Sequence, residues 1–430
     1  MKRRCAIGKR RVMQMKKRLL CFTMLLTVTI SAITFTNNVK AATKWNTSKS
    51  VTKEENGIKY SAYLTEDGKE SWIYQIKLSK KVTKLTLPKE INQAKLTRVG
   101  FGKELYNKGE DEDAYQNLFG DTIEPWHNCY GDLSNDDKNK QTIETVAIPA
   151  TVNQLEIATF SGMKKLKSVV IPEQTASVPA YTFAKCSALS KVTFSKNMNE
   201  IDSTAFVKSN QVKTFSCPKA NKTFAVKKGM LTTRSGKTLV LVPNKMKKLT
   251  IPSSVKEIKA NALNGSQATS IVIPKSVKKI GAKALESKKI TKVSLSSKNK
   301  TYKMANNCIY RKSNGTLTAV LVKTKKITIP SKVKVIDDTV SVMGKIGTKN
   351  QVHIPKSVKK VVEDWMFFGD SATVYFHGTK PPVIVSKFKG NEFTALPIFN
   401  KVYVPKKAKK TYIKWAKDRD GLKWNNLHTF

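Results

Sequence analysis

Histidine is scarce in this 430-residue sequence, and the motifs of the common enzyme classes are missing. Only four histidines occur, and none has a second ligand residue at the helical spacing that metal sites use. There is no Gly-x-Ser-x-Gly nucleophile motif, no phosphate-binding glycine loop and no Cys-x-x-Cys pair. These absences argue against hydrolases, nucleotide-dependent enzymes and thiol redox proteins. We therefore expect a protein that is not an enzyme and uses no cofactor.

Cysteine is also rare, and two of the six cysteines lie in the first 41 residues. Three others, Cys186, Cys217 and Cys308, stand at positions that related repeats fill with methionine, isoleucine or phenylalanine. We expect each of them to be a small buried apolar group. A disulfide is the alternative if the protein is exported.

Arginine and acidic residues are few in comparison with lysine. The chain has 79 Lys and Arg against 31 Asp and Glu, a formal net charge of +48, and only nine of the basic residues are arginine. Residues 146–430 alone carry 53 basic and 14 acidic side chains. Lysine is a mobile point charge, whereas proteins that read bases depend on the planar arginine fork. The composition therefore favours diffuse attraction to polyanions and argues against specific nucleic-acid binding.

A repeated apolar pattern with a period of 23 residues runs from Ile143 to Pro218. A fixed period of this length is typical of a solenoid, in which each coil buries its apolar face against its neighbours. We therefore expect a mainly β solenoid with short helices and turns. The clearest columns of equivalent residues are Val146/Val169/Val192/Phe215, Ile148/Ile171/Phe194/Cys217 and Phe160/Phe183/Phe206.

A longer unit interrupts the period after Pro218 and occurs twice. The segment Asn221-Lys222-Thr223-Phe224 returns 78 positions later as Asn299-Lys300-Thr301-Tyr302. In each copy a turn signal, Ser235-Gly236 or Asn314-Gly315, separates two apolar runs, which predicts hairpins over about 221–250 and 299–328. We accordingly divide the repeats into a regular block, 143–218, and a block with two hairpins, 219–376.

Residues 1–41 have the features of an export signal. Nine Lys or Arg precede an apolar run from Leu19 to Phe35, and Val39-Lys40-Ala41 places small residues where a signal peptidase cleaves. We predict cleavage after Ala41, which leaves no transmembrane segment in the mature chain. An uncleaved membrane anchor is the alternative, because the run is about 17 residues long.

Residues 42–142 combine strand-like alternation with an acidic insertion over about 106–140. The alternation predicts an N-terminal β cap on the first coil. In the insertion, Asp132 and Asp136 are candidate calcium ligands, but the segment lacks the glycine and the distal glutamate of an EF-hand loop. One alternative to a calcium site is a solvated insertion that folds back on the basic repeats. Another alternative is that the insertion holds the carboxylate pair of a glycoside-cleaving enzyme.

Residues 377–430 depart from the repeat pattern. Pro381-Pro382 interrupts it, and Val402-Tyr403-Val404-Pro405 predicts a last strand. Ala408, Tyr412 and Trp415 then recur at helical spacing. We expect a helical C-terminal cap that buries this face.

The repeat unit resembles the BspA-like leucine-rich repeat. The best copy is Leu166-x-x-Val169-x-Ile171-Pro172, followed by Val178, Thr182-Phe183 and Cys186, and Thr204-Ala205-Phe206 repeats its second half. The resemblance implies a leucine-rich-repeat solenoid and an exported bacterial surface protein that binds other macromolecules without catalysis. It carries over no fixed set of binding residues. The chain also shows no sortase-type motif followed by an apolar tail, so we expect any attachment to the wall to be non-covalent.

Lysines follow the repeat as well. Ser276-Val277-Lys278-Lys279-Ile280 and Ser357-Val358-Lys359-Lys360-Val361 are near copies. Because every coil presents equivalent positions to the same side, we predict a lysine stripe that attracts anionic polymers, with a merely solvated face as the alternative. The candidate binding residues are Lys275, Lys278, Lys279, Lys356, Lys359 and Lys360.

Together these features predict an exported, non-catalytic protein that mediates adhesion or macromolecular binding at the bacterial cell surface. The expected partner is an anionic cell-wall polymer or a sulfated glycan, and a protein on a host or neighbouring cell is a second possibility. An extracellular enzyme with its site in the acidic insertion, or a general polyanion or nucleic-acid binder, are the alternatives.

Overall fold

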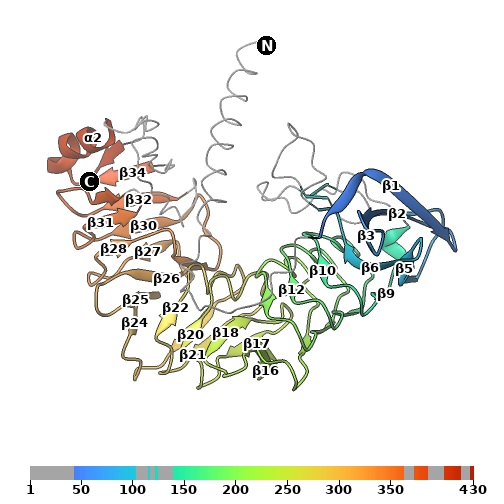
Figure 1. Ribbon diagram of the computed structural model, residues 1–430. Helices are drawn as coiled ribbons and strands as arrows, with labels where there is room; N and C mark the ends of the chain where they lie inside the picture. The colour runs from blue at the N-terminus through green and yellow to red at the C-terminus, as the bar shows by residue number, and fades with distance from the viewer. Residues whose placement is uncertain are drawn as a thin grey trace, which may run out of the picture. The chain divides into compact units, whose positions relative to one another are not determined.

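The computed structural model describes residues 43–102, 115–116, 122–123, 139–362, 372–385, 401–417 and 427–430 (Figure 1). The predicted export signal and the candidate ligands Asp132 and Asp136 lie outside the described residues. Residues 45–430 form one unit made almost entirely of short β-strands. Within the described ranges, no helix is long and apolar enough to cross a membrane.

An N-terminal sheet leads directly into the repeats. Its antiparallel strands β1, β2 and β3 form a meander that buries Ile58, Tyr60 and Ala62. β6 then pairs parallel with β3, and the coil strand β10 pairs parallel with β6. The predicted β cap is therefore hydrogen-bonded to the first coil. The strands are β1 (Trp45–Glu55), β2 (Ile58–Thr65), β3 (Glu70–Leu78), β5 (Glu90–Ile91), β6 (Ala94–Val99) and β10 (Gln154–Leu155), with a separate pair, β7 (Tyr115–Gln116) and β8 (Thr122–Ile123).

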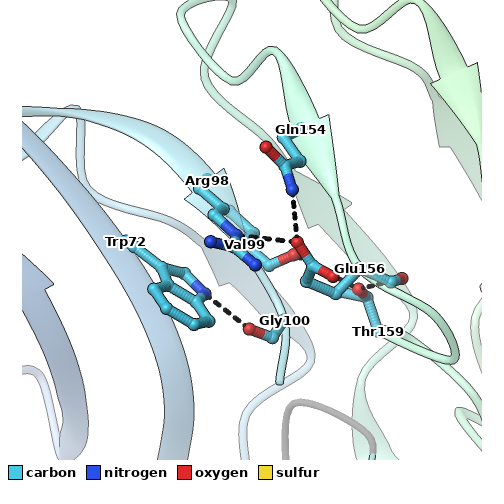
Figure 2. Close-up of polar contacts among 7 residues, drawn as sticks. All are labelled: Trp72, Arg98, Val99, Gly100, Gln154, Glu156 and Thr159. Atoms are coloured by element: carbon cyan, nitrogen blue, oxygen red, sulfur yellow. Dashed lines mark hydrogen bonds and ion pairs between the residues drawn. The ribbon is translucent and has the colours of Figure 1, made fainter. Parts of the chain in front are cut away.

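Buried polar contacts join this sheet to the first coil (Figure 2). Arg98 Nε donates a hydrogen bond to Glu156 Oε1 at 2.7 Å, and Gln154 Nε2 donates to the same oxygen at 2.6 Å. The Arg98 guanidinium lies 3.7 Å from the centroid of the Trp72 ring, whose Nε1 donates to the Gly100 carbonyl at 2.6 Å. The Arg98 and Glu156 side chains are only 4% and 13% exposed. Removing one of them would leave the other charge buried without its partner.

The regular block consists of parallel coils, and every coil except the last, which holds β15, has one longer and one shorter strand. The central residue of each longer strand, such as Val169 or Val192, faces the core, and equivalent residues are in register. Phe160, Phe183 and Phe206 stack at 5.6 and 5.7 Å between ring centroids. The predicted solenoid is thus confirmed. The N-terminal segment contributes β4 (Lys84–Thr86), which pairs parallel with β9, and η2 (Lys140–Thr142). The longer strands of the block are β9 (Thr145–Ala147), β11 (Ser168–Val170), β13 (Lys191–Thr193) and β15 (Thr214–Ser216), and the shorter strands are β12 (Ser177–Val178) and β14 (Glu200–Ile201).

The recurring asparagine has a clear structural role. Asn221 Nδ2 donates to the carbonyls of Ser195 and Met198, at 2.9 and 2.8 Å, and its Oδ1 accepts from the amides of Thr223 and Phe224. One buried side chain therefore satisfies four backbone groups where the regular coil ends. Asn299 makes the equivalent four hydrogen bonds in the second copy.

Each inserted unit has three strands, where the sequence predicts a two-stranded hairpin. The predicted turn at Ser235-Gly236 joins the second strand to the third. An earlier turn, at Lys228-Gly229 and again at Asn306-Asn307, joins the first two strands, and both residues of each pair have positive φ. The third strand then pairs parallel with the next coil. The units comprise β16 (Phe224–Lys227), β17 (Met230–Thr233) and β18 (Thr238–Leu241), and β24 (Tyr302–Ala305), β25 (Cys308–Arg311) and β26 (Leu317–Leu321).

Parallel coils resume between and after these units. The coils between them contain β19 (Lys248–Thr250), β20 (Glu257–Ile258), β21 (Ser270–Ile273), β22 (Lys279–Ile280) and β23 (Lys292–Leu295). The later coils contain β27 (Lys326–Thr328), β28 (Val335–Ile336), β29 (Ser341–Met343), β30 (Gln351–Ile354), β31 (Lys360–Val362), β32 (Thr373–Phe376), β33 (Val383–Val385), β34 (Lys401–Val404) and β35 (Leu427–Thr429).

The C-terminal helix packs as its spacing predicts. It consists of η3 (Lys406–Ala408) and α2 (Lys409–Lys417). Ala408 and Tyr412 are fully buried, and Tyr412 Oη donates to the Gly378 carbonyl at 3.1 Å. The helix is not the last element, because β35 follows it and pairs parallel with β34.

Candidate binding surfaces

A tight turn positions the predicted lysines. Val277 N donates to the Pro274 carbonyl at 3.3 Å, and Val358 N donates to the Pro355 carbonyl at 3.1 Å. Both valines are buried, and the lysines that follow them, Lys278 and Lys359, lie at the surface. All six predicted lysines, Lys275, Lys278, Lys279, Lys356, Lys359 and Lys360, are exposed.

Equivalent lysines of neighbouring coils lie next to one another. Lys256 N donates to the Lys237 carbonyl and Lys278 N donates to the Lys256 carbonyl, both at 2.7 Å. In the later coils Lys359 N donates to the Lys334 carbonyl at 2.9 Å. We refer to Lys237, Lys256, Lys278, Lys334 and Lys359 as the turn lysines. Their backbones repeat at the strand spacing of about 4.8 Å, so these like charges are held close together.

The turn lysines form two short columns, not one continuous stripe. Lys334 N donates to the Gly315 carbonyl, so glycine takes the place that Lys237 holds in the earlier copy. Beyond Lys359 the next equivalent position is Pro382, since Val383 N donates to the Lys359 carbonyl. The columns therefore span three coils and two coils.

Two of the predicted lysines have different surroundings despite their equivalent positions. Lys279 forms an ion pair of 2.8 Å with Glu257, its register partner on β20. Lys360 lies in register with Val335 and Val383, neither of which carries a charge. An exposed ion pair of this kind contributes at most about 1 kcal/mol to the free energy of unfolding, but it partly neutralises the charge of Lys279.

The surroundings of the turn lysines contain very little negative charge. Residues 203–362 hold 35 Lys and Arg but only four acids, Glu257, Glu286, Asp337 and Asp338. Glu286 is half-buried, and this loss of solvation raises the pKa of its carboxyl group, which accepts a hydrogen bond from Val342 N at 2.7 Å. Four carboxyl groups cannot balance 35 cations, so this block requires external counterions.

Among the described residues, the other side chains considered as ligands do not form a binding site. No group of three or more His, Cys, Asp or Glu side chains is arranged for a metal in the part of the chain that the structure describes. Cys186, Cys217 and Cys308 are free thiols. Cys186 and Cys308 are fully buried, as predicted, and burial raises the pKa of each thiol to about 12, whereas Cys217 is only half-buried.

The last coils carry an aromatic surface that the sequence analysis did not predict. His353, Tyr375, Tyr403 and His428 each follow the inward residue of β30, β32, β34 and β35, and they lie in register on the outward side. Their rings stack at centroid distances of 4.4, 4.6 and 4.9 Å. We call these four residues the aromatic column. Its signal in the sequence is an aromatic residue between two buried ones, as in Val402-Tyr403-Val404.

His377 and Phe430 lie beside the aromatic column. His353 Nδ1 and His377 Nε2 share a hydrogen bond of 2.9 Å, and the Phe430 ring lies 5.2 Å from the His377 ring. Partial burial, with a contribution from nearby Lys326, lowers the pKa of both imidazoles, that of His353 to about 4. Both histidines are therefore neutral at pH 7.

A comparison with protein families identifies the repeats. The family described as "BspA type leucine rich repeat region" matches residues 138–228 and 243–373 in six copies. No curated protein matches the sequence. The fold is similar to a leucine-rich cell surface protein from Faecalibacterium prausnitzii, at 13% identity over 76% of this chain and 95% of that chain (TM-score 0.35). It is also similar to the pneumococcal vaccine antigen PcpA, at 14% identity over 88% and 98% (TM-score 0.36), and to a leucine-rich repeat protein from Eubacterium ventriosum, at 14% over 83% and 94% (TM-score 0.35).

Proposed function

Since the chain belongs to the BspA-type leucine-rich repeat family, we propose that it is a non-catalytic bacterial surface protein that binds an anionic polymer through its turn lysines. The polymer is a wall teichoic acid or a chemically similar sulfated glycan. In this proposal the chain is exported, cleaved after Ala41 and held on the cell wall without a covalent bond.

The observation that carries this proposal is the imbalance of 35 basic to four acidic residues over residues 203–362. A polymer with regularly spaced phosphate or sulfate groups would replace the small counterions that this surface requires. Release of those counterions, together with the summed field, supplies the favourable free energy. The turn lysines are exposed and stacked at strand spacing, so a chain-like ligand can contact several of them at once.

The residue type also matters for the class of ligand. A lysine ammonium group is a mobile point charge and tolerates irregular spacing of anions along a polymer. It provides no planar fork for a particular base or phosphate geometry. We therefore expect binding that depends on charge density and salt, with little dependence on the exact polymer chemistry.

The test is retention of the mature chain, residues 42–430, on purified Gram-positive cell walls as salt is raised. A variant with Lys256, Lys278, Lys334 and Lys359 changed to Gln should be released at clearly lower salt than the wild type. A control with the exposed Lys49, Lys59, Lys77 and Lys89 changed to Gln has the same net charge and should behave like the wild type. Walls stripped of teichoic acid should retain little of any of the three proteins.

Equal retention on intact and stripped walls would refute a teichoic-acid partner. Equal release of the two variants would show that net charge alone, and not the position of the turn lysines, controls binding. Retention that persists at about 1 M salt, where the Debye length is only about 3 Å, would contradict an electrostatic mechanism.

A further inference from the structure

We propose that the aromatic column, with Phe430 beside it, is a second binding site that takes a neutral, linear glycan built of pyranose rings. This site differs from the turn lysines in chemistry, and the inference does not depend on polymer binding by those lysines.

The backbone does not require aromatic residues at these positions. The equivalent outward positions of the N-terminal and regular coils carry small or β-branched residues, and so do those of the middle coils. These residues are Thr86, Ala147, Val170, Thr193 and Ser216, and then Thr250, Val272 and Ser294. From His353 onward, the equivalent outward position of each paired strand carries an aromatic ring.

The core does not require them either. The inward residues Val352, Val374 and Val402 of β30, β32 and β34 are at most 4% exposed and already fill the interior. The rings of the aromatic column stand on the opposite, solvent-facing side, where they are half-buried or exposed, and Phe430 is 52% exposed. Their shared positions therefore point to a surface role.

Stacking leaves the polar edges of the rings available to a ligand. The faces of Tyr375 lie against His353 and Tyr403, so the column presents mainly ring edges and hydroxyl groups to solvent. Neither the Tyr375 nor the Tyr403 hydroxyl has a hydrogen-bond partner among the described residues. Because the strands are about 4.8 Å apart, these groups form a row that repeats along the solenoid.

The rings of the aromatic column carry no charge, which favours contacts with the hydroxyl groups of a neutral ligand. His353 and His377 are uncharged at pH 7, for the reasons given above, and tyrosine hydroxyls both donate and accept hydrogen bonds. In the neighbouring outward column Gln351 and Thr373 add uncharged polar groups, and Lys326 and Lys401 lie at its two ends. The lysine ammonium groups can also donate hydrogen bonds to sugar hydroxyls. A pyranose ring combines hydroxyl groups with apolar C–H faces, and so matches hydroxyl-bearing ring edges beside the exposed ring of Phe430.

The test is calorimetric titration of the mature chain with chitohexaose, cellohexaose and maltohexaose in about 0.5 M NaCl, where long-range electrostatic attraction is screened. At least one hexasaccharide should bind. Tyr375→Thr/Tyr403→Thr, which gives the last coils the residue type of the other coils, should weaken its affinity by about tenfold or more. Tyr375→Phe/Tyr403→Phe keeps the stacked rings but removes their hydroxyl groups, and it should weaken the affinity several-fold.

The matched control is Tyr63→Thr/Tyr74→Thr, which removes a comparable stacked pair, at 4.4 Å, from the N-terminal sheet. It should leave the affinity unchanged, as should the four-lysine variant described above. Failure of all three sugars to bind the wild-type protein would overturn the proposal. An equal loss in the Tyr375/Tyr403 and Tyr63/Tyr74 variants, or no loss in either, would also overturn it.

Discussion

In the regular coils the strand residues that face solvent are small or β-branched, as Val170 and Thr193 show, whereas in the last coils Tyr375 and Tyr403 take the equivalent positions. The residues that face the core hardly differ between the two regions, since Val169 and Val192 correspond to Val352 and Val374. The inward columns are fixed by stacking against the neighbouring coils. The outward columns are free of that constraint and can carry binding groups.

The largest effect should come from breaking an inward column. Phe183 is fully buried between Phe160 and Phe206, so Phe183→Ala should cost about 3–5 kcal/mol of unfolding free energy. Urea unfolding of the mature chain and of the variant measures this loss of unfolding free energy. Val170→Thr changes a residue of the same block that is 63% exposed and should stay within about 0.5 kcal/mol of the wild type. Similar costs for the two variants would contradict the division into inward and outward columns.

A smaller loss is expected where the regular coils end. Asn221→Ala would remove four hydrogen bonds and leave buried backbone groups unpaired, which should cost about 2–3 kcal/mol. Asn299→Ala should cost a similar amount, because its contacts are equivalent. Urea unfolding of both variants checks this. A loss below about 0.5 kcal/mol in both would show that other groups or water satisfy the backbone.

Replacing the outward rings should affect stability less than either change. Tyr375→Thr/Tyr403→Thr removes stacking at 4.4–4.9 Å but no core packing, so we expect a loss of about 1–2 kcal/mol. Thermal unfolding compares the variant with the wild type. A loss as large as that of Phe183→Ala would mean that the aromatic column is part of the core.

Mild acid should weaken the last coils selectively. The pKa of His353 is about 4 in the folded chain, below its ordinary value near 6.5, because of burial, Lys326 and His377. As pH falls, the unfolded chain takes up this proton first, so the stability contributed above pH 6.5 is lost progressively down to about pH 4. Two-dimensional NMR of the imidazole groups would follow both histidines. A His353 pKa of 6 or higher in the folded protein would contradict this account.

The inward half of the fold can be predicted from the sequence, but much of the surface cannot. A period of 23 residues identifies the solenoid, because residues such as Phe183 recur at fixed positions and pack on their own copies. The turn at Lys228-Gly229 was not predicted, because the nearby turn signal Ser235-Gly236 already accounts for a hairpin. The aromatic column cannot be predicted from a repeat period, because the numbers of residues from His353 to Tyr375 and from Tyr375 to Tyr403 differ. Its rings come together only through strand pairing.

The lysine positions were predictable individually, but their arrangement was not. Exposure of Lys278 and Lys359 follows from the buried valine that precedes each of them. The division into two columns depends on Gly315 and Pro382, which take the equivalent position in neighbouring coils. The ion pair between Lys279 and Glu257 depends on the register of β20 and β22.

The most direct test of the central claim is the salt dependence of binding to purified poly(glycerol phosphate) teichoic acid. The logarithm of the affinity of the wild-type chain should fall linearly with the logarithm of salt concentration, because binding releases counterions. Changing Lys256, Lys278, Lys334 and Lys359 to Gln should make that slope clearly shallower, while changing Lys49, Lys59, Lys77 and Lys89 should leave it as in the wild type. Identical slopes for all three proteins, or an affinity that does not depend on salt, would contradict the account.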